Sequence, residues 1–253
     1  MIDLTIKEFR SHWENLNLSG KHQIYWCIMV DNSGSMVDHR NIDYEVLVVI
    51  MEVLRKLESK FAVARFGSQT HQKILKNFND LFTNQDGQYV LEALTFNEGT
   101  YPATGLARIA HKIFPVTESA IQPNIVVHRL VLMLTDGLTH ERNYASYLTT
   151  IYKNQINLGF MFIETADQSS SRILLRDLKQ VENCVLKTNS IAELPLEISE
   201  LMHKMIKKSL KITSILSLQS RVEISSMINI KVPNIREVTL FKKPRLMNKS
   251  TPI

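Results

Sequence analysis

One carboxylic acid and two hydroxyl side chains alternate at the point where an apolar run of the chain ends. Asp31, Ser33 and Ser35 directly follow residues 24–30, all of which are apolar. Mg²⁺ prefers hard oxygen ligands in near-octahedral geometry, and one tight turn with these three side chains supplies several ligands at once. Gly34 is expected to let the turn bend closely. The pattern predicts a metal site; the alternative is that Ser33 or Ser35 caps the following helix.

Two later stretches offer further oxygen ligands. Thr100 stands just before a segment with the features of a helix start, and Asp136 with Gly137 ends a second apolar run that begins near residue 128. The apolar runs are predicted to be buried strands of a parallel sheet, and the carboxyl ends of such strands are where open α/β sheets bind ligands. Thr104 is the alternative to Thr100 in this set.

The order and spacing of these residues resemble the von Willebrand factor A (VWA) domain and its metal-ion-dependent adhesion site (MIDAS). The resemblance covers roughly residues 21–210 and rests on Asp-x-Ser-x-Ser, a threonine, and Asp-Gly after a later strand. It implies that Ser33 and Ser35 bind the metal directly. It also implies that Asp31 and Asp136 bind directly or through water, and that Thr100 joins when a ligand is engaged.

The same resemblance implies a function. Neutral hydroxyls leave the ion under-neutralised, so that a vacant position attracts an acidic side chain from another protein, which in this family completes the octahedron. We therefore expect a non-enzymatic, divalent-metal-dependent protein-binding module that uses Mg²⁺ or Mn²⁺. Thr100 is preferred to Thr104 because residues 103–105 resemble the helix start that follows the family's liganding threonine.

Other segments look like the C-terminal MIDAS domain of the midasin family. They are residues 61–67, 77–78 with 81–82 and Gly87, 94–96, and 191–195. This resemblance implies a partner such as a ubiquitin-like domain of a ribosome assembly factor, on pre-60S particles. Asn32 and Gly34 depart from the acid and lysine expected in the midasin loop, and the chain has no ATPase ring.

Hydrophobic periodicity predicts an α/β fold, a mostly parallel sheet with helices on both faces, and the resemblance implies that this is the Rossmann-like VWA fold. Strands are expected at 24–30, 61–66, 73–78 (an edge), 128–134, 156–163 and 183–187. Helices are expected at 44–57, 141–153, 171–181 and 191–210, and helices or turns at 87–96 and 103–114. The expected organisation is an N-terminal arm at 1–20, a VWA/MIDAS domain at 21–210 and a basic C-terminal extension at 211–253.

Composition and cysteine usage favour an intracellular protein. The chain is 44% hydrophobic and 22% charged, which is ordinary for a globular protein. Cys27 and Cys184 form neither a spaced metal pair nor a disulfide framework, so a reducing compartment is expected. Neither a membrane segment nor a secretory signal is expected. The expected location is nuclear or cytoplasmic.

The end of the chain is strongly basic. Residues 204–253 carry eleven Lys or Arg against two acids, a net charge of +9, which leaves −4 on the other 203 residues of a chain with net charge +5. A compact cluster lies at 242–245. Such a cluster suits RNA phosphates or nuclear import, and the alternative is a solvated arm. Short strands are expected at 214–218, 221–224 and 228–232.

Enzymatic alternatives find less support. No phosphate-binding loop of the Gly-x-x-x-x-Gly-Lys-Ser/Thr type occurs, and Ser33 stands where a haloacid-dehalogenase-type phosphatase needs a second acid. A Mg²⁺-dependent hydrolase would also need a nucleophile, a general base and a phosphate anchor. A VWA subunit that serves another AAA+ ATPase is a further alternative. Near the metal rim, Asp38, His39, His140 and Glu141 either shape partner choice or belong to solvated loops.

Overall fold

The computed structural model describes residues 3, 4, 6, 7, 10, 22–114, 125–141, 145–163, 181–186 and 193–219, of which 185, 186 and 213–219 are described as backbone only. The chain divides into two compact units, 1–213 and 214–253, and the description below concerns the first. Most of the expected N-terminal arm, the helix expected at 171–181 and the strands expected at 221–224 and 228–232 lie outside the described residues.

A six-stranded sheet in the order β3-β2-β1-β4-β5-β6 forms the centre of the first unit. Its strands are β1 (His22–Asp31), β2 (Lys60–Phe66), β3 (Lys73–Lys76), β4 (Val126–Thr135), β5 (Ile156–Ile163) and β6 (Glu182–Leu186). All pair in parallel except the edge strand β3. The predicted mostly parallel α/β sheet is therefore confirmed. Strand order reverses between β1 and β4, where an open sheet of this kind leaves a crevice at its carboxyl end.

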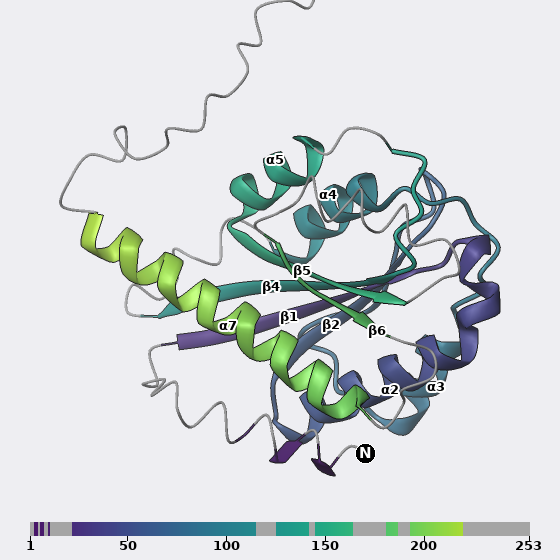
Figure 1. The fold of residues 1–253 in the computed structure, drawn as a ribbon, viewed down its shortest axis with the longest axis horizontal. Coiled ribbons are helices and arrows are strands. Elements are labelled where there is room, and N and C mark those ends of the chain that lie inside the picture. The colour runs from purple at the N-terminus through teal and green to yellow at the C-terminus, as the bar shows by residue number, and fades with distance from the viewer. Residues whose placement is uncertain are drawn as a thin grey trace, which may run out of the picture. The chain divides into compact units, whose positions relative to one another are not determined.

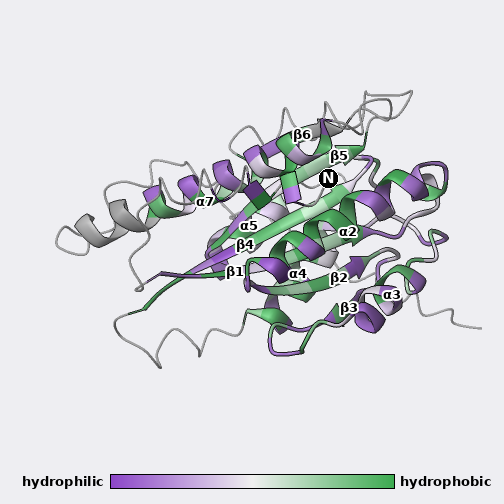
Figure 2. Cartoon of the chain, turned by 90° about the horizontal axis from the view of Figure 1, so that it is seen from below, coloured by the Kyte–Doolittle hydropathy of each residue, from purple (hydrophilic) through white to green (hydrophobic). Residues whose placement is uncertain are grey.

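Helices cover both faces of the sheet (Figure 1). They are η1 (Gly34–His39), α2 (Arg40–Lys56), α3 (Asn84–Glu92), α4 (Pro102–Ile113), α5 (Ala145–Asn154) and α7 (Leu194–Gln219). Side chains of β1 alternate between two apolar cores: Trp26 and Ile28 join a core with α2 and α7, whereas Cys27 and Met29 join one with α4. Figure 2 shows the apolar strands between the amphipathic helices. The alternation of the β1 side chains between the two cores follows from the two-residue period of a strand.

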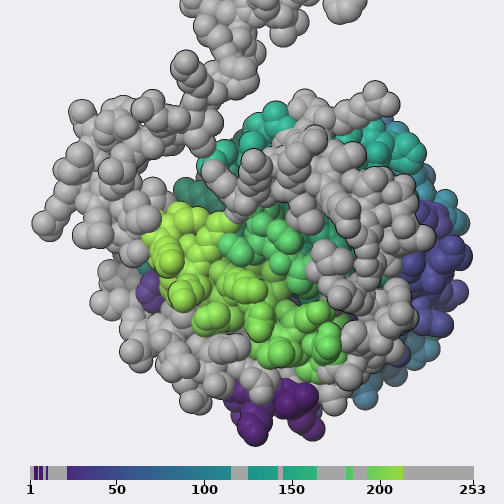
Figure 3. Space-filling model, in the orientation of Figure 1, coloured from purple at the N-terminus to yellow at the C-terminus, as the bar shows by residue number. Residues whose placement is uncertain are grey.

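The C-terminal helix differs from the expectation. Residues 214–218 belong to α7, which continues to Gln219, so the strand predicted there is wrong. Adding a residue to an existing helix costs far less than nucleating a new element, and the apolar residues of this stretch extend the pattern of the helix before it. In Figure 3, α7 lies on the face toward the viewer. It packs so closely on β5 that a Cβ at Gly159 would overlap Met205.

None of the described helices combines the length and apolar character needed to cross a membrane.

Candidate functional site

Asp31 ends β1 and is completely buried, with 0% of its surface exposed. Its Oδ1 accepts a hydrogen bond from the backbone N–H of Ser33 (2.9 Å), and its Oδ2 accepts one from the Thr135 hydroxyl (2.7 Å). Burial, together with the nearby charge of Asp136, raises the pKa of Asp31 to about 7, although the hydrogen bonds from Thr135 and Ser33 lower it. The side chain is therefore fixed in place, and a cation beside it would favour the ionised form.

The two serine hydroxyls face one another, with 3.1 Å between Ser33 Oγ and Ser35 Oγ. Ser33 precedes η1 but makes no capping hydrogen bond through its side chain, which removes the capping alternative for that residue. The expectation for Gly34 is wrong: its φ is not left-handed, and a Cβ there would meet nothing within 4 Å. A side chain would fit at this position, so the turn owes its shape to other contacts.

Asp136 follows β4 and is 1% exposed. Its Oδ1 accepts a hydrogen bond from the Leu138 N–H (2.9 Å), while Oδ2 is buried and has no hydrogen-bond partner in the described part of the chain. Gly137 next to it adopts a left-handed φ of 84°, which a glycine takes without strain. The Thr135 hydroxyl, which donates to Asp31, also accepts from the Gly137 N–H (3.0 Å). These bonds join the Asp136 loop to the end of β1.

The structure separates the roles of the two candidate threonines. Thr104 binds Glu141 through both its backbone N–H and its hydroxyl, so this side chain is occupied as part of the start of α4. The Thr100 hydroxyl makes no hydrogen bond within the described part of the chain, although the residue is buried. His140 holds the backbone of Thr100 by two hydrogen bonds. Its ring Nδ1 accepts from the Thr100 N–H (3.1 Å), and its backbone N–H donates to the Thr100 carbonyl (3.0 Å).

The predicted rim residues therefore divide into two kinds. His140 and Glu141 join the Asp136 loop to the Thr100 loop and the start of α4, a positioning role that the sequence did not indicate. Asp38 is exposed and His39 half-buried in η1. The Thr100 loop also pairs with the Asp31 loop, because Gly34 N–H donates to the Glu98 carbonyl (3.0 Å). The three predicted loops thus converge at the carboxyl end of β1 and β4.

A further acid belongs to this region and was missed in the sequence. Asp43, in the first turn of α2, is 0% exposed, and neither of its carboxylate oxygens has a hydrogen-bond partner among the residues that the structure describes. Burial, followed by the charges of Asp31 and Asp136, raises its pKa well above the ordinary value. A signal did exist: Asp43 lies three and four positions before the buried Val46 and Leu47, on the apolar stripe of the helix.

The donor set fits a hard divalent cation held partly by hydroxyls. Among the described residues, three buried carboxylate oxygens lack a hydrogen-bond partner, two of Asp43 and one of Asp136. The same end of the sheet carries the hydroxyls of Ser33 and Ser35, which hydrogen-bond to one another, and the hydroxyl of Thr100. Within the described ranges, no three His, Cys, Asp or Glu side chains lie close enough to hold an ion by themselves. Any ion here would therefore need the hydroxyls as ligands, and Asp43 would act at longer range.

Comparisons with known proteins identify the fold. No protein-family model matches the sequence. A von Willebrand factor type A structure from Catenulispora acidiphila aligns at a TM-score of 0.51 and 18% identity, over 73% of this chain and 43% of that one. Proximal thread matrix protein 1 (PTMP1) from the mussel byssus aligns at 0.54 and 20%, over 74% and 48%.

BatB from Bacteroides thetaiotaomicron aligns at a TM-score of 0.50 and 13% identity, over 73% of this chain and 99% of that one. The chain spans less than half the length of the first two structures. At these identities the likeness concerns the fold, and it agrees with the strand order and the two helix layers. The protein has a von Willebrand factor A-type fold.

Proposed function

We propose that this protein is a non-enzymatic, divalent-metal-dependent protein-binding module whose MIDAS-type metal captures an acidic side chain of a partner. The observation that carries the proposal is the set of buried carboxylate oxygens of Asp43 and Asp136 that lack partners among the described residues, at the end of the sheet where the loops of Ser33, Ser35 and Thr100 converge. Buried anionic oxygens are costly unless a cation or a donor satisfies them. A bound Mg²⁺ or Mn²⁺ would supply that charge.

The burial pattern favours capture of an acid from outside. Asp31 and Asp136 are buried, whereas Gly34 is exposed and Ser35 half-buried, so the ion's accessible side is bounded by neutral groups. A neutral hydroxyl offsets little of a divalent charge, and an incoming carboxylate offsets much more. One neighbouring structure, a PTMP1 form, carries zinc in its MIDAS motif, which supports metal binding by this arrangement in the fold.

Calorimetry with Mg²⁺ and Mn²⁺ tests the metal site directly. We expect a single binding site that Asp31→Ala removes, with tighter binding when an acidic partner is present. Failure of both ions to bind, with or without partner, would refute the proposal. On the partner's side, a scan that replaces each acid by its amide should find one indispensable Asp or Glu. Phosphate release from model substrates that disappears in Asp31→Ala would instead favour a hydrolase.

The finer proposal concerns the partner and rests on sequence resemblance to the midasin family. We propose a ubiquitin-like domain of a ribosome assembly factor as partner, with action on pre-60S particles in the nucleus. A pull-down with and without chelator tests it, because the true partner is lost when the metal is removed. Recovery of a different AAA+ ATPase complex, and of no ribosome assembly factor, would favour the alternative of a VWA subunit outside ribosome assembly.

The basic C-terminal extension is proposed to contact RNA. Release of counterions would make such binding fall steeply with salt. Since α7 continues to Gln219, the truncation that tests this should remove residues 220–253 and leave the helix intact. We expect weaker RNA binding at low salt and an unchanged melting temperature of the domain. Equal RNA affinity with and without the segment would contradict the proposal.

A further inference from the structure

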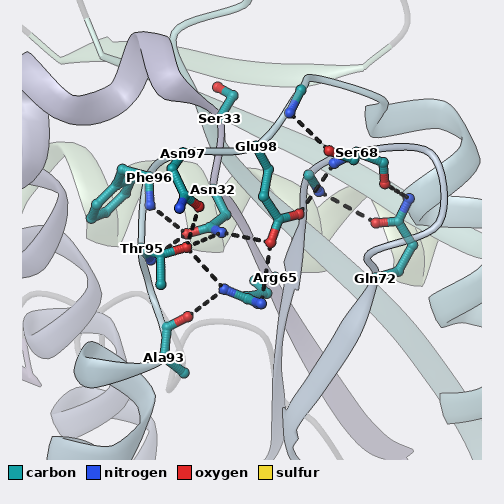
Figure 4. A network of polar contacts seen from close by, with 12 residues as sticks. Asn32, Ser33, Arg65, Ser68, Gln72, Ala93, Thr95, Phe96, Asn97 and Glu98 are labelled. Atoms are coloured by element: carbon teal, nitrogen blue, oxygen red, sulfur yellow. Dashed lines mark hydrogen bonds and ion pairs between the residues drawn. The ribbon is translucent and has the colours of Figure 1, made fainter.

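The side chain of Asn32 uses its full hydrogen-bonding capacity on one segment, residues 95–98. Its Oδ1 accepts from the backbone N–H groups of Thr95 (2.7 Å) and Phe96 (2.9 Å). Its Nδ2 donates to the Thr95 hydroxyl (3.0 Å) and to Glu98 Oε1 (3.1 Å). Figure 4 shows the amide pointing into this network, whereas the Ser33 side chain points away from it. Only an amide both accepts and donates in this way.

Glu98 is the acceptor at the centre of the network. Its Oε1 pairs with Arg65 (3.1 Å), and its Oε2 accepts from the Ser68 N–H (3.2 Å). The two charged side chains are 11% and 17% exposed, so solvent screens the pair little. A Cβ at Gly67 would overlap the Glu98 carboxylate, so the backbone there has to be glycine. The carboxylate of Glu98 is thus committed to the protein and is not available to a metal.

The network also holds a strained residue. Phe96 adopts a left-handed φ of 50° although it is bulky and buried, and such a conformation persists where the surroundings determine it. Its N–H is one of the two that Asn32 accepts. On the backbone, Glu98 N–H donates to the Asn32 carbonyl (3.2 Å) and Gly34 N–H donates to the Glu98 carbonyl (3.0 Å). Because Thr100 follows Glu98 by only two residues, these hydrogen bonds also fix the backbone that leads to Thr100.

We propose that Asn32 and Glu98 are positioning residues that lock the Thr100 loop onto the Asp31–Ser35 loop, so that the free domain holds its metal ligands in place before a partner arrives. This inference rests on the proposed function. It gives the amide at Asn32 a physical reason. An acid at this position would bring a second carboxylate next to Glu98 Oε1 and would donate to neither Glu98 nor Thr95.

A charge exchange between the two positions tests the lock. Asn32→Asp adds one negative charge to a network in which Arg65 balances Glu98, and the double variant with Glu98→Gln restores the original charge while returning an amide that can donate. We expect Asn32→Asp to weaken Mn²⁺ binding in calorimetry by about 10–100-fold, as outer-shell changes do. The double variant should recover most of this loss. The matched control Glu92→Gln makes the same acid-to-amide change on an exposed residue of α3 and should leave Mn²⁺ affinity unchanged.

A second control separates positioning from general destabilisation. Val63→Ala removes buried core atoms from β2 and should lower the melting temperature while the Mn²⁺ affinity stays near wild type. The positioning role is overturned if Asn32→Asp binds Mn²⁺ with wild-type affinity. It is also overturned if the double variant loses as much Mn²⁺ affinity as Asn32→Asp and Glu98→Gln lose separately, added together. If the wild-type protein binds neither Mg²⁺ nor Mn²⁺, with or without an acidic partner, the proposed function fails and the positioning role fails with it. If the wild-type protein binds Mn²⁺ and Asn32→Asp binds it equally well, the positioning role alone is overturned.

Discussion

The two ends of the central sheet differ in whether their buried polar groups are all hydrogen-bonded. At the amino end, His22 Nδ1 lies 2.9 Å from His128 Nε2, and His128 Nδ1 lies 2.8 Å from the Ser209 hydroxyl of α7. At the carboxyl end, the Asp43 carboxylate and one oxygen of Asp136 are buried without hydrogen-bond partners among the described residues. Satisfied polar groups hold elements together, whereas unsatisfied buried ones destabilise the fold unless a ligand satisfies them. This difference supports the metal site proposed at the carboxyl end.

Removal of a metal ligand should give the largest effect. Asp136→Ala is expected to weaken metal binding by more than about 100-fold, beyond what outer-shell changes cause. The melting temperature without metal should hold or rise, because Oδ2 of Asp136 has no partner to lose and one of several close charges disappears. Asp31→Ala should lower the melting temperature relative to Asp136→Ala, because the Ser33 N–H and the Thr135 hydroxyl both lose their acceptor. Calorimetry and thermal unfolding in EDTA measure both effects; unchanged metal affinity in Asp136→Ala would remove this residue from the site.

Asp43→Asn tests whether the buried acid of α2 destabilises the domain in the absence of metal. We expect the free energy of unfolding without metal to rise by about 1–3 kcal/mol, because a buried unpaired acid is replaced by a neutral group of the same shape. Urea unfolding in EDTA measures the change. Asp38→Asn, an exposed acid in the neighbouring η1, is the matched control and should have little effect. A loss of stability in Asp43→Asn would show that the acid has a stabilising partner and would break the contrast between the two ends.

The two threonines should separate binding from stability. Thr104→Val removes the hydroxyl bond to Glu141 at the start of α4 and is expected to cost about 1 kcal/mol of unfolding free energy, with metal affinity unchanged. Thr100→Val should leave stability nearly unchanged and should weaken binding of metal and partner together. Calorimetry and urea unfolding of both variants check this. The opposite assignment of effects would make Thr104 the ligand.

The two ends should also titrate with opposite signs in EDTA. Asp31 has a folded pKa of about 7 against an ordinary 3.8, so protons bind the folded state better and its contribution to stability falls as pH rises from about 4 to 7. His128 has a pKa lowered to about 4 from 6.5, by burial and then by His22, so its contribution rises with pH between about 4 and 6.5. Each slope is at most about 1.4 kcal/mol per pH unit for one proton.

Asp31→Asn and His128→Gln isolate these two contributions when urea unfolding is followed from pH 4 to 8. Relative to wild type, the Asp31 variant should gain in stability as pH rises through this window, and the His128 variant should gain as pH falls. Changes of the same sign in both variants would contradict the contrast.

Much of the fold follows from local sequence patterns. The apolar runs that became β1, β4 and β5 are long and rich in β-formers, because strands of a parallel sheet that is covered on both faces bury successive side chains. The metal motif was also visible, because Asp31, Ser33 and Ser35 are neighbours and the sheet topology brings Thr100 and Asp136 to the same edge. Their role as ligands stays a prediction. The strand expected at 214–218 failed since a short apolar run fits a helix equally well.

What holds the site together was decided by tertiary structure alone. Asn32 meets Glu98 across 66 positions of the chain, and Asp31 meets Thr135 across 104. No local preference specifies such partners, because they depend on which strand ends become neighbours and which backbone groups remain to be satisfied. The burial of Asp43 had a local signal in the apolar stripe of α2, but its closeness to Asp31 and Asp136 was decided by the packing. The sequence by itself determined the oxygen atoms on offer and the elements that carry them; packing determined which of those oxygens are bonded within the protein and which remain free for a cation.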